Sequence, residues 1–231
     1  MEVNSSELRT VSDFEKAALD RCLDNVGKIY FSAGANTPST PKDNEEALKS
    51  YRIVPRMLRD VAGANIECNI LGNGMCSPIG VSPTGCLFLA HPQAEVAAVR
   101  GCLKEGCIFI LSCLSSTTLE EVANIVHEVE GNQAVLWLQL YIFRNRSLTL
   151  NLLKKAEELN FSAVVVSVDS PIGGLWKNVM PQNFLDVLKP KLPNIPGPAR
   201  QLLDDTLTFR DLVWLKEHTK LNIVAKGVMS G

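Results

Sequence analysis

Polar side chains stand in this sequence where short apolar runs end, at 107–112, 134–141, 162–169 and 222–227. The set contains one primary amide, which offers both a hydrogen-bond donor and an acceptor and so suits the imide edge of a heterocyclic ring. It also contains a lysine, which can neutralise the negative charge that develops on such a ring when it is reduced. The members of this polar set are Ser112, Gln139, Tyr141, Ser167, Asp169 and Lys226.

The apolar runs alternate with longer amphipathic stretches from about residue 78 onward. This alternation is typical of βαβ units in a parallel sheet, and functional groups of such sheets collect at the C-terminal ends of the strands. Side chains of a strand alternate between its two faces, so Gln139 and Tyr141 share a face, as do Ser167 and Asp169. We expect strands at 78–82, 107–112, 134–141, 162–169 and 222–227, and helices over Pro92–Glu105, from Thr118, over Ser147–Leu159 and from Thr208.

Two interpretations of the polar set remain open. Buried polar groups are costly unless they are hydrogen-bonded, so the set predicts either a polar ligand or a network in which these side chains satisfy one another. Five successive strands that end in this way favour the ligand. Before the first strand, Ser12 and the residues after it indicate an N-terminal helix, and 66–74 reads as a short hairpin.

Composition restricts the possible partners of the chain. Its 231 residues suffice for one domain, or at most two small ones. The 23 Lys and Arg residues against 25 Asp and Glu residues give a net charge of -2, which argues against nucleic acid. No apolar run approaches the ~18 residues of a membrane helix. Seven cysteines without a Cys-x-x-Cys pair indicate reduced thiols and no metal site.

Several short motifs have a specific order and spacing, and they extend from the first helix to the last predicted strand. These motifs are Tyr30-Phe31-Ser32-Ala33-Gly34-Ala35, Arg52 with Pro55-Arg56-Met57-Leu58-Arg59-Asp60-Val61, Pro78-Ile79, Ser82-Pro83-Thr84-Gly85, Ala90-His91-Pro92, Leu111-Ser112, Gln139-Leu140-Tyr141, Val168-Asp169-Ser170-Pro171 and Lys226-Gly227-Val228. Together they resemble the FMN-dependent 2-hydroxy-acid oxidase family, the group of glycolate oxidase. The resemblance implies an α/β fold, a partial (β/α)8 TIM barrel of about five βα units preceded by N-terminal helices and a short hairpin.

The resemblance also implies a flavoprotein oxidoreductase with FMN as cofactor. Its reaction would oxidise a small (S)-2-hydroxy acid to the 2-oxo acid, with oxygen as acceptor. The positions that match FMN-binding residues are Pro83, Thr84, Gly85, Ser112, Gln139, Ser167 and Lys226. Tyr30 and Tyr141 match tyrosines that contact the substrate, and Tyr141 and Asp169 match catalytic positions, the aspartate orienting a catalytic histidine.

The sequence departs from the family pattern at Trp176 and at its C-terminal end. Trp176 stands where an arginine would clamp the substrate carboxylate, and an indole cannot form that bidentate contact. The sequence stops at Gly231, so the region of the catalytic histidine is missing. We therefore expect residues 1–231 to form one truncated FMN hydroxy acid dehydrogenase-type domain, inactive alone, with a Pro-rich, lid-like loop at about 171–205.

The alternative is a non-catalytic truncated paralogue or isoform that acts by binding another chain. Five strands leave two open parallel edges, which invite pairing with a further strand. The partner would be a second copy of the chain, giving a homo-oligomer, or a full-length paralogue. Family members often reside in peroxisomes, whereas this sequence ends in Met229-Ser230-Gly231 rather than a Ser-Lys-Leu address, so we expect peroxisomal or cytoplasmic residence.

Overall fold

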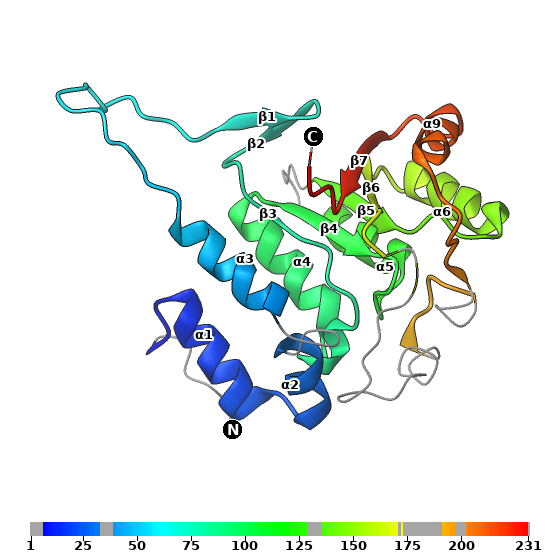
Figure 1. The fold of residues 1–231 in the computed structure, drawn as a ribbon, viewed down its shortest axis with the longest axis horizontal. Helices are drawn as coiled ribbons and strands as arrows, with labels where there is room; N and C mark the ends of the chain where they lie inside the picture. Colours follow the sequence, from blue (N-terminus) through cyan, green and yellow to red (C-terminus); the bar gives the residue numbers. More distant parts are fainter. Residues whose placement is uncertain are drawn as a thin grey trace.

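The computed structural model describes residues 7–32, 39–128, 135–170, 172, 191–196 and 202–230. Its main feature is one parallel sheet of five strands in the order β3-β4-β5-β6-β7 (Figure 1). Each strand lies beside the strand that follows it in the chain, as repeated βαβ units require. The strands are β3 (Gly80–Val81), β4 (Ile108–Ser112), β5 (Leu136–Leu140), β6 (Ala163–Ser167) and β7 (Asn222–Lys226).

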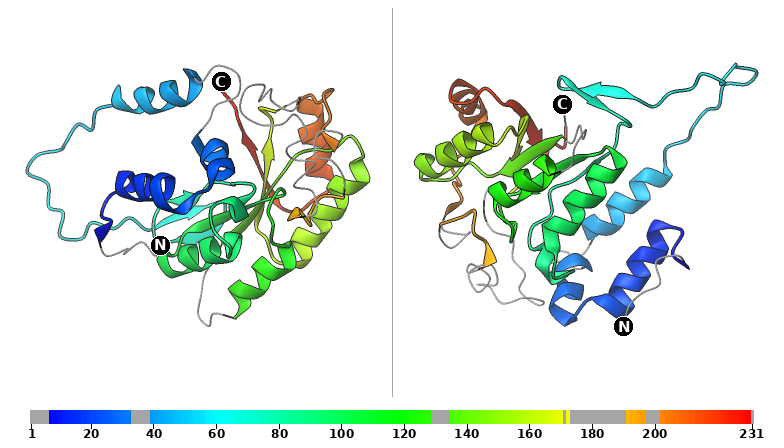
Figure 2. Two further views of the ribbon diagram at one scale, coloured as in Figure 1. Left: turned by 90° about the horizontal axis from the view of Figure 1, so that it is seen from below. Right: turned by 180° about the vertical axis from the view of Figure 1, so that it is seen from behind.

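Helices connect the strands and lie around the outer side of the curved sheet (Figure 2). They are α4 (Ala94–Glu105), α5 (Leu119–His127), α6 (Arg146–Glu158) and α9 (Phe209–Glu217). Thr118 begins α5 with a reciprocal capping box to Glu121, and Thr208 begins α9 with an equally complete one to Asp211. The five predicted strands and four connecting helices are confirmed, with ends that differ by a few residues.

The sheet remains open, because β3 and β7 at its two ends are not paired with each other. A complete barrel of this type has no edge, since its eighth strand pairs with its first. The described residues therefore form the partial barrel that the sequence predicted.

The two faces of the sheet contribute to two separate apolar clusters. The outer core packs the sheet against its helices and includes Phe109, Leu111, Leu138, Leu140, Val164 and Val166 from the strands. The inner core lies on the concave face and consists of Met75, Ile108, Val135, Trp137, Ala163 and Val165. The hairpin of β1 (Cys68–Ile70) and β2 (Asn73–Met75) supplies Met75 to this inner core, and Leu71 O accepts a hydrogen bond from Asn222 Nδ2 at 3.2 Å.

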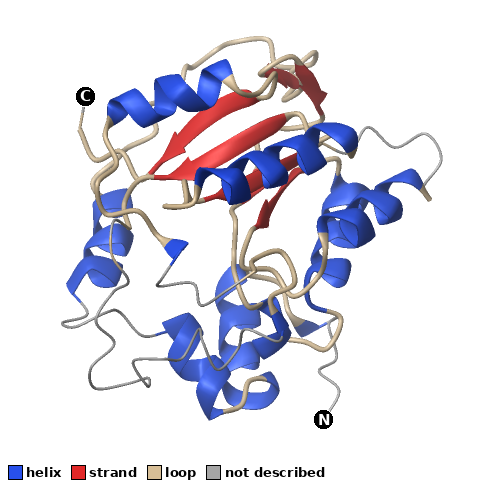
Figure 3. Cartoon of the chain, turned by 90° about the vertical axis from the view of Figure 1, so that its right-hand side faces the viewer, coloured by secondary structure: helices blue, strands red, loops and turns tan. Residues whose placement is uncertain are grey.

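The N-terminal region consists of short helices beside α4 and a long arm that leads to the hairpin (Figures 1 and 3). The helices are α1 (Val11–Ala17), the π-helix η2 (Ala18–Cys22), α2 (Asn25–Ser32) and α3 (Ser39–Lys49). The predicted N-terminal helix is confirmed, but Ser12 lies inside it and does not begin it. Thr10 caps α1 instead, because its hydroxyl accepts from Asp13 N at 3.2 Å while the Asp13 carboxylate accepts from Thr10 N at 2.8 Å.

Part of the predicted lid-like loop lies outside the described residues. Of 171–205, the structure describes residue 172 and the stretches 191–196 and 202–205, and Trp176 is not among them. In the part of the chain that the structure describes, no helix is long and apolar enough to cross a membrane.

Candidate functional site

The polar set lies at the C-terminal end of the sheet, on the side of the inner core. Residues of a strand alternate between faces, so Ser112 follows Ile108 and Ile110 on the inner face, and Gln139 follows Val135 and Trp137. The register places Ser112 beside Gln139 and Ser167 beside Lys226. Four strands thus end their inner faces in polar side chains at one edge of the sheet, as the sequence predicted.

Three buried side chains of this edge form a hydrogen-bonded chain. Ser112 Oγ donates to Gln139 Oε1 at 3.0 Å, and Gln139 Nε2 donates to Ser167 Oγ at 3.1 Å. The alternative in which the polar groups satisfy one another is therefore observed. A primary amide has two N–H donors and two acceptor lone pairs, so Gln139 retains one of each beyond these bonds. The network fixes the orientation of the amide and leaves one N–H donor and one acceptor lone pair of Gln139 unused.

Tyr141 lies at the same edge, immediately after β5. Burial, with smaller contributions from nearby Cys113 and Asp169, raises the pKa of its phenol to about 12, although a side-chain hydrogen bond with Ser167 opposes the rise. At neutral pH the phenol is therefore protonated and can donate a hydrogen bond.

Lys226 and Asp169 form an ion pair at the open end of the site. Lys226 Nζ lies 3.3 Å from Asp169 Oδ2, and both side chains are about 40% exposed, at 40% and 43%. Gly227 follows with φ +104°, and a Cβ at this position would lie 2.5 Å from Asp169 Cβ. The pair therefore depends on a glycine, because only glycine combines this backbone conformation with so close an approach.

The Pro83–Gly85 loop brings Tyr30 of α2 to the same region. The loop is tied to the end of β4 because Cys86 N donates to Leu114 O at 3.1 Å. A Cβ on Gly85 would lie 3.1 Å from Leu114 Cβ and 3.3 Å from Tyr30 Oη, so a larger residue here would displace the tyrosine. Burial first, then the neighbouring Cys86 and Tyr141, hold the pKa of Tyr30 well above its usual range.

All ten candidate residues thus lie toward one end of the sheet, and they come from six separate segments of the chain. Three contacting residues were missed by the sequence analysis. Cys86 hydrogen-bonds Tyr30, and the buried Glu95 and the half-buried Asn194 bind the loop after β4. A glutamate in the first turn of a helix and an asparagine between prolines are ordinary in sequence, so only burial and contact distinguish these residues.

The site contains no imidazole. His91, His127 and His218 are the three histidines of the chain, and all are exposed. His218 lies 2.8 Å from Trp214 O through Nδ1 at the end of α9. Among the described residues, no group of three or more His, Cys, Asp or Glu side chains is placed to hold a metal ion.

Comparisons with known proteins identify relatives over nearly the whole chain. A family model described as FMN-dependent dehydrogenase matches residues 20–231. The 2-hydroxyacid oxidase 1 of Mus musculus is 32% identical over 240 residues, which cover 96% of this chain and 63% of that protein. The 2-hydroxyacid oxidase of Dictyostelium discoideum is 33% identical over 232 residues, covering 95% of this chain and 58% of the relative.

Solved structures agree with the sequence relatives. The recombinant flavin-binding domain of baker's yeast flavocytochrome b2 has a TM-score of 0.83 and 29% identity, over 98% of this chain and 55% of that one. A mandelate oxidase variant with (S)-mandelic acid has a TM-score of 0.76 and 27% identity, over 95% of this chain and 61% of that one. The chain thus spans between 55% and 63% of the length of these relatives.

Proposed function

Because this chain belongs to the FMN-dependent dehydrogenase family, we propose that it serves the oxidation of a small (S)-2-hydroxy acid to the 2-oxo acid. FMN is the cofactor of the family, and oxygen is the proposed acceptor. The bound flavin would accept two electrons from the substrate. The residues of this chain would hold the flavin ring and one side of the substrate.

The buried chain from Ser112 through Gln139 to Ser167 is the observation that carries the proposal. It fixes an amide whose remaining N–H and lone pair fit the alternating donors and acceptors of an imide edge. Lys226 at the neighbouring strand end supplies a positive charge for the N1 and O2 edge of the ring, where reduction places negative charge. The donor set therefore fits the ring of FMN.

The Pro83–Gly85 loop and the two tyrosines complete the proposed site. Backbone can approach a planar ring closely at Gly85, where no Cβ intervenes. The phenols of Tyr30 and Tyr141 are protonated at neutral pH, so each can donate a hydrogen bond to the carboxylate of a 2-hydroxy acid. Asp169 is the proposed orienting carboxylate for a histidine base.

We propose that these 231 residues bind FMN but do not turn over by themselves. Proton removal from the substrate needs a base near the flavin, and all three histidines of the chain are exposed elsewhere. We also propose that residues 1–231 form one domain of this family, with a lid-like loop at about 171–205. Relatives include a protein named as a peroxisomal (S)-2-hydroxyacid oxidase in Arabidopsis thaliana, and we propose peroxisomal or cytoplasmic residence for this chain.

A flavin titration of the purified chain tests the proposal. FMN fluorescence is expected to be quenched on binding, and Gln139→Leu is expected to raise the Kd at least about tenfold, because two hydrogen-bonding groups are lost. Asn151→Leu is the matched control, because Asn151 is an exposed amide side chain on α6, in the outer layer of the molecule. Absence of binding, or equal Kd values for the two variants, would refute the proposed ring site.

The same sample tests the requirement for an external base. Anaerobic addition of glycolate, lactate or mandelate is expected to leave the bound flavin oxidised, as its visible absorbance reports. Bleaching of the flavin by any of these acids would show that the 231 residues contain a sufficient base.

A second candidate function is non-catalytic binding of another chain, either a second copy or a full-length paralogue. It is favoured by the open outer edges of β3 and β7, which end the sheet, and by Ile79 and Val81 at the first of these edges, which are 62% and 41% exposed. Light scattering of the purified chain is expected to show association in this case. A monomer that also fails to capture a full-length relative would exclude it.

A further inference from the structure

The loop that follows β4 is the first feature of interest. This loop, Leu114–Thr117, is bonded directly to Ser112: Leu114 N donates to Ser112 Oγ at 3.1 Å, and Ser115 N donates to Ser112 O at 3.0 Å. Ser112 Oγ in turn donates to Gln139 Oε1. The position of the loop therefore determines where the Ser112 hydroxyl points, and through it the orientation of the Gln139 amide.

Glu95 binds this loop from α4. Its side chain is buried, with the residue only 1% exposed, although it lies in the first turn of the helix. It accepts hydrogen bonds from Ser116 N at 3.2 Å, Ser116 Oγ at 2.8 Å and Thr117 Oγ1 at 2.8 Å. A buried carboxylate is costly unless charge-assisted hydrogen bonds compensate it, and these three bonds all come from the loop.

Asn194 binds the same loop from the opposite side. Its Nδ2 donates to Ser115 Oγ at 2.8 Å and to Thr117 O at 2.9 Å. The short segment 191–196 that carries Asn194 is itself anchored, because Leu192 and Ile195 are buried in the outer core at 1% and 4% exposure. Asn194 therefore has an anchored backbone from which it can hold Ser115 and Thr117 in place.

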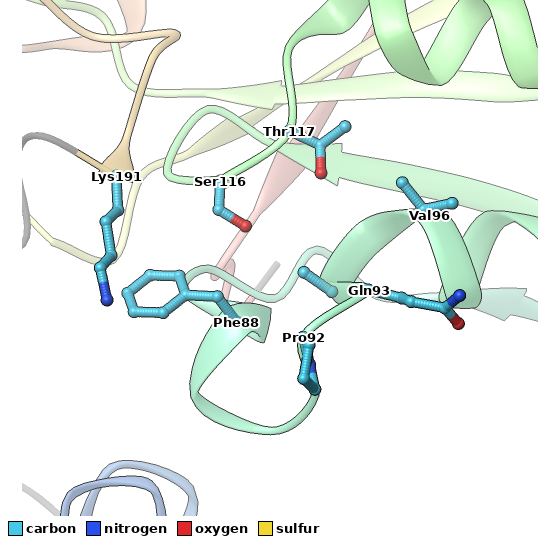
Figure 4. Close-up of a pocket in the computed structure, with 8 residues that line it drawn as sticks. Phe88, Pro92, Gln93, Val96, Ser116, Thr117 and Lys191 are labelled. Carbon is cyan, nitrogen blue, oxygen red and sulfur yellow. The ribbon is translucent and has the colours of Figure 1, made fainter.

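The loop also lies beside a pocket. A pocket of about 520 Å³ lies where Ser116 and Thr117 face the start of α4 and Lys191 (Figure 4). Lys191 Nζ lies 4.8 Å from the centre of the Phe88 ring across this hollow. Leu114 packs against the outer core, and Glu95 and Asn194 supply the polar bonds that hold Ser115, Ser116 and Thr117.

We propose that Glu95 and Asn194 are positioning residues for the flavin site, which hold Leu114–Thr117 and thereby orient Ser112 and Gln139. This inference rests on the proposed function for its consequence in FMN binding. The positioning itself is a property of the chain without any ligand. The alternative is that both residues only add to global stability, as any buried polar contact would.

Hydrogen exchange resolved to single amides distinguishes these two roles in the whole chain. Asn194→Ala and Glu95→Ala are expected to speed exchange of the Leu114 and Ser115 amides by about tenfold or more, because each removes at least two hydrogen bonds to the loop. Glu95→Gln, which keeps the shape and one acceptor, is expected to fall between. Asn194 is only half-buried, so its variant keeps the test usable even where Glu95→Ala fails to fold.

Thr149→Val is the matched control. Thr149 is fully buried and its hydroxyl accepts from Phe143 N at 3.0 Å, so its loss costs a buried hydrogen bond away from the loop. Thr149→Val is expected to leave the Leu114 and Ser115 amides unchanged after correction for global stability. Equal effects of Asn194→Ala and Thr149→Val on these amides would overturn the positioning role.

The FMN titration adds a second readout that a purely structural role would not move. Asn194→Ala is expected to weaken FMN binding by about tenfold and to shift the visible absorption of the bound flavin, whereas Thr149→Val changes neither. If the unaltered chain binds no FMN, the proposed function fails, and the exchange rates still decide the positioning role. Faster loop exchange together with unchanged FMN affinity would overturn the link to the flavin site.

Discussion

The two faces of the same sheet differ in what covers them. On the outer face, Leu111, Leu138 and Leu140 are 0% exposed and pack against helices along the whole length of the strands. On the inner face, Ile110 and Val224 remain only partly buried, and the indole Nε1 of the buried Trp137 has no hydrogen-bond partner among the described residues. The outer face is complete as a core, whereas the inner face is not.

The inner face is also divided along its length. Its N-terminal half is apolar and is covered by the hairpin of β1 and β2, whereas its C-terminal end carries Ser112, Gln139, Ser167 and Lys226. A continuous apolar face provides burial, and burial of apolar surface is the main source of stability. The outer face therefore provides most of the buried apolar surface, whereas one end of the inner face carries the polar side chains that we propose to bind the flavin.

Truncation of a core leucine is expected to produce the largest difference between the two faces. Leu138→Ala in the outer core should lower the free energy of unfolding by about 3–4 kcal/mol, because the cavity cannot collapse in a fully packed site. Ile110→Ala on the inner face should cost about 1–2 kcal/mol, because its side chain is already partly exposed. Urea denaturation of both variants measures the contrast, and equal losses would show that the inner face is as well packed as the outer one.

A smaller effect is expected from adding a methyl group to glycines in the two layers. Gly227→Ala at the polar edge should destabilise the chain by about 2 kcal/mol, because φ is +104° and the new Cβ would contact Asp169. Gly101→Ala is the control in the outer layer: it lies within α4 with no atom within 4 Å of a Cβ, and should stabilise by about 0.5–1 kcal/mol. Thermal unfolding measures the shift in Tm of each variant, which should be downward for Gly227→Ala and upward for Gly101→Ala. Shifts in the same direction would contradict the proposed difference between the two glycines.

The smallest effect is expected in how the free energy of unfolding changes at alkaline pH. Burial raises the pKa of the outer-core Cys113 thiol from 9.0 to about 12, and that of Tyr141 from 10.0 to about 12. Both groups stay protonated in the folded chain where the unfolded chain ionises, so their contribution is complete below the unfolded pKa and declines as pH rises above it. The decline should begin near pH 9 for Cys113 and near pH 10 for Tyr141.

Two variants separate these contributions. Cys113→Ala should reduce the loss of stability that begins near pH 9, to which the buried thiols of Cys86 and Cys102 also contribute because burial raises their pKa values to about 11. Tyr141→Phe should leave that onset and reduce the slope only above about pH 10. Urea unfolding between neutral pH and about pH 10.5 measures both profiles. An unchanged profile in Cys113→Ala would mean that the thiol already ionises in the folded chain.

The amino-acid sequence predicted the strands, their faces and the helix starts, because each of these depends on residues that are close together in the chain. The alternation of side chains in a strand puts Gln139 on the same face as Trp137, whatever the rest of the chain does. A hydroxyl followed three residues later by an acid begins a helix at Thr118 and Thr208. The same rule, applied two residues too late, pointed to Ser12 in place of Thr10. The ten candidate residues were likewise identified from strand ends and family motifs.

What the amino-acid sequence determined was therefore the set of strands, their polar ends and the family to which the chain belongs. Only the tertiary structure decided that Gln139 lies level with Val165, so that its amide reaches two residues along β6 to Ser167, and that Glu95 and Asn194 meet on one loop. The physical reason is that periodicity acts within an element. Register, burial and the contact of residues distant in sequence arise only when separate elements pack together.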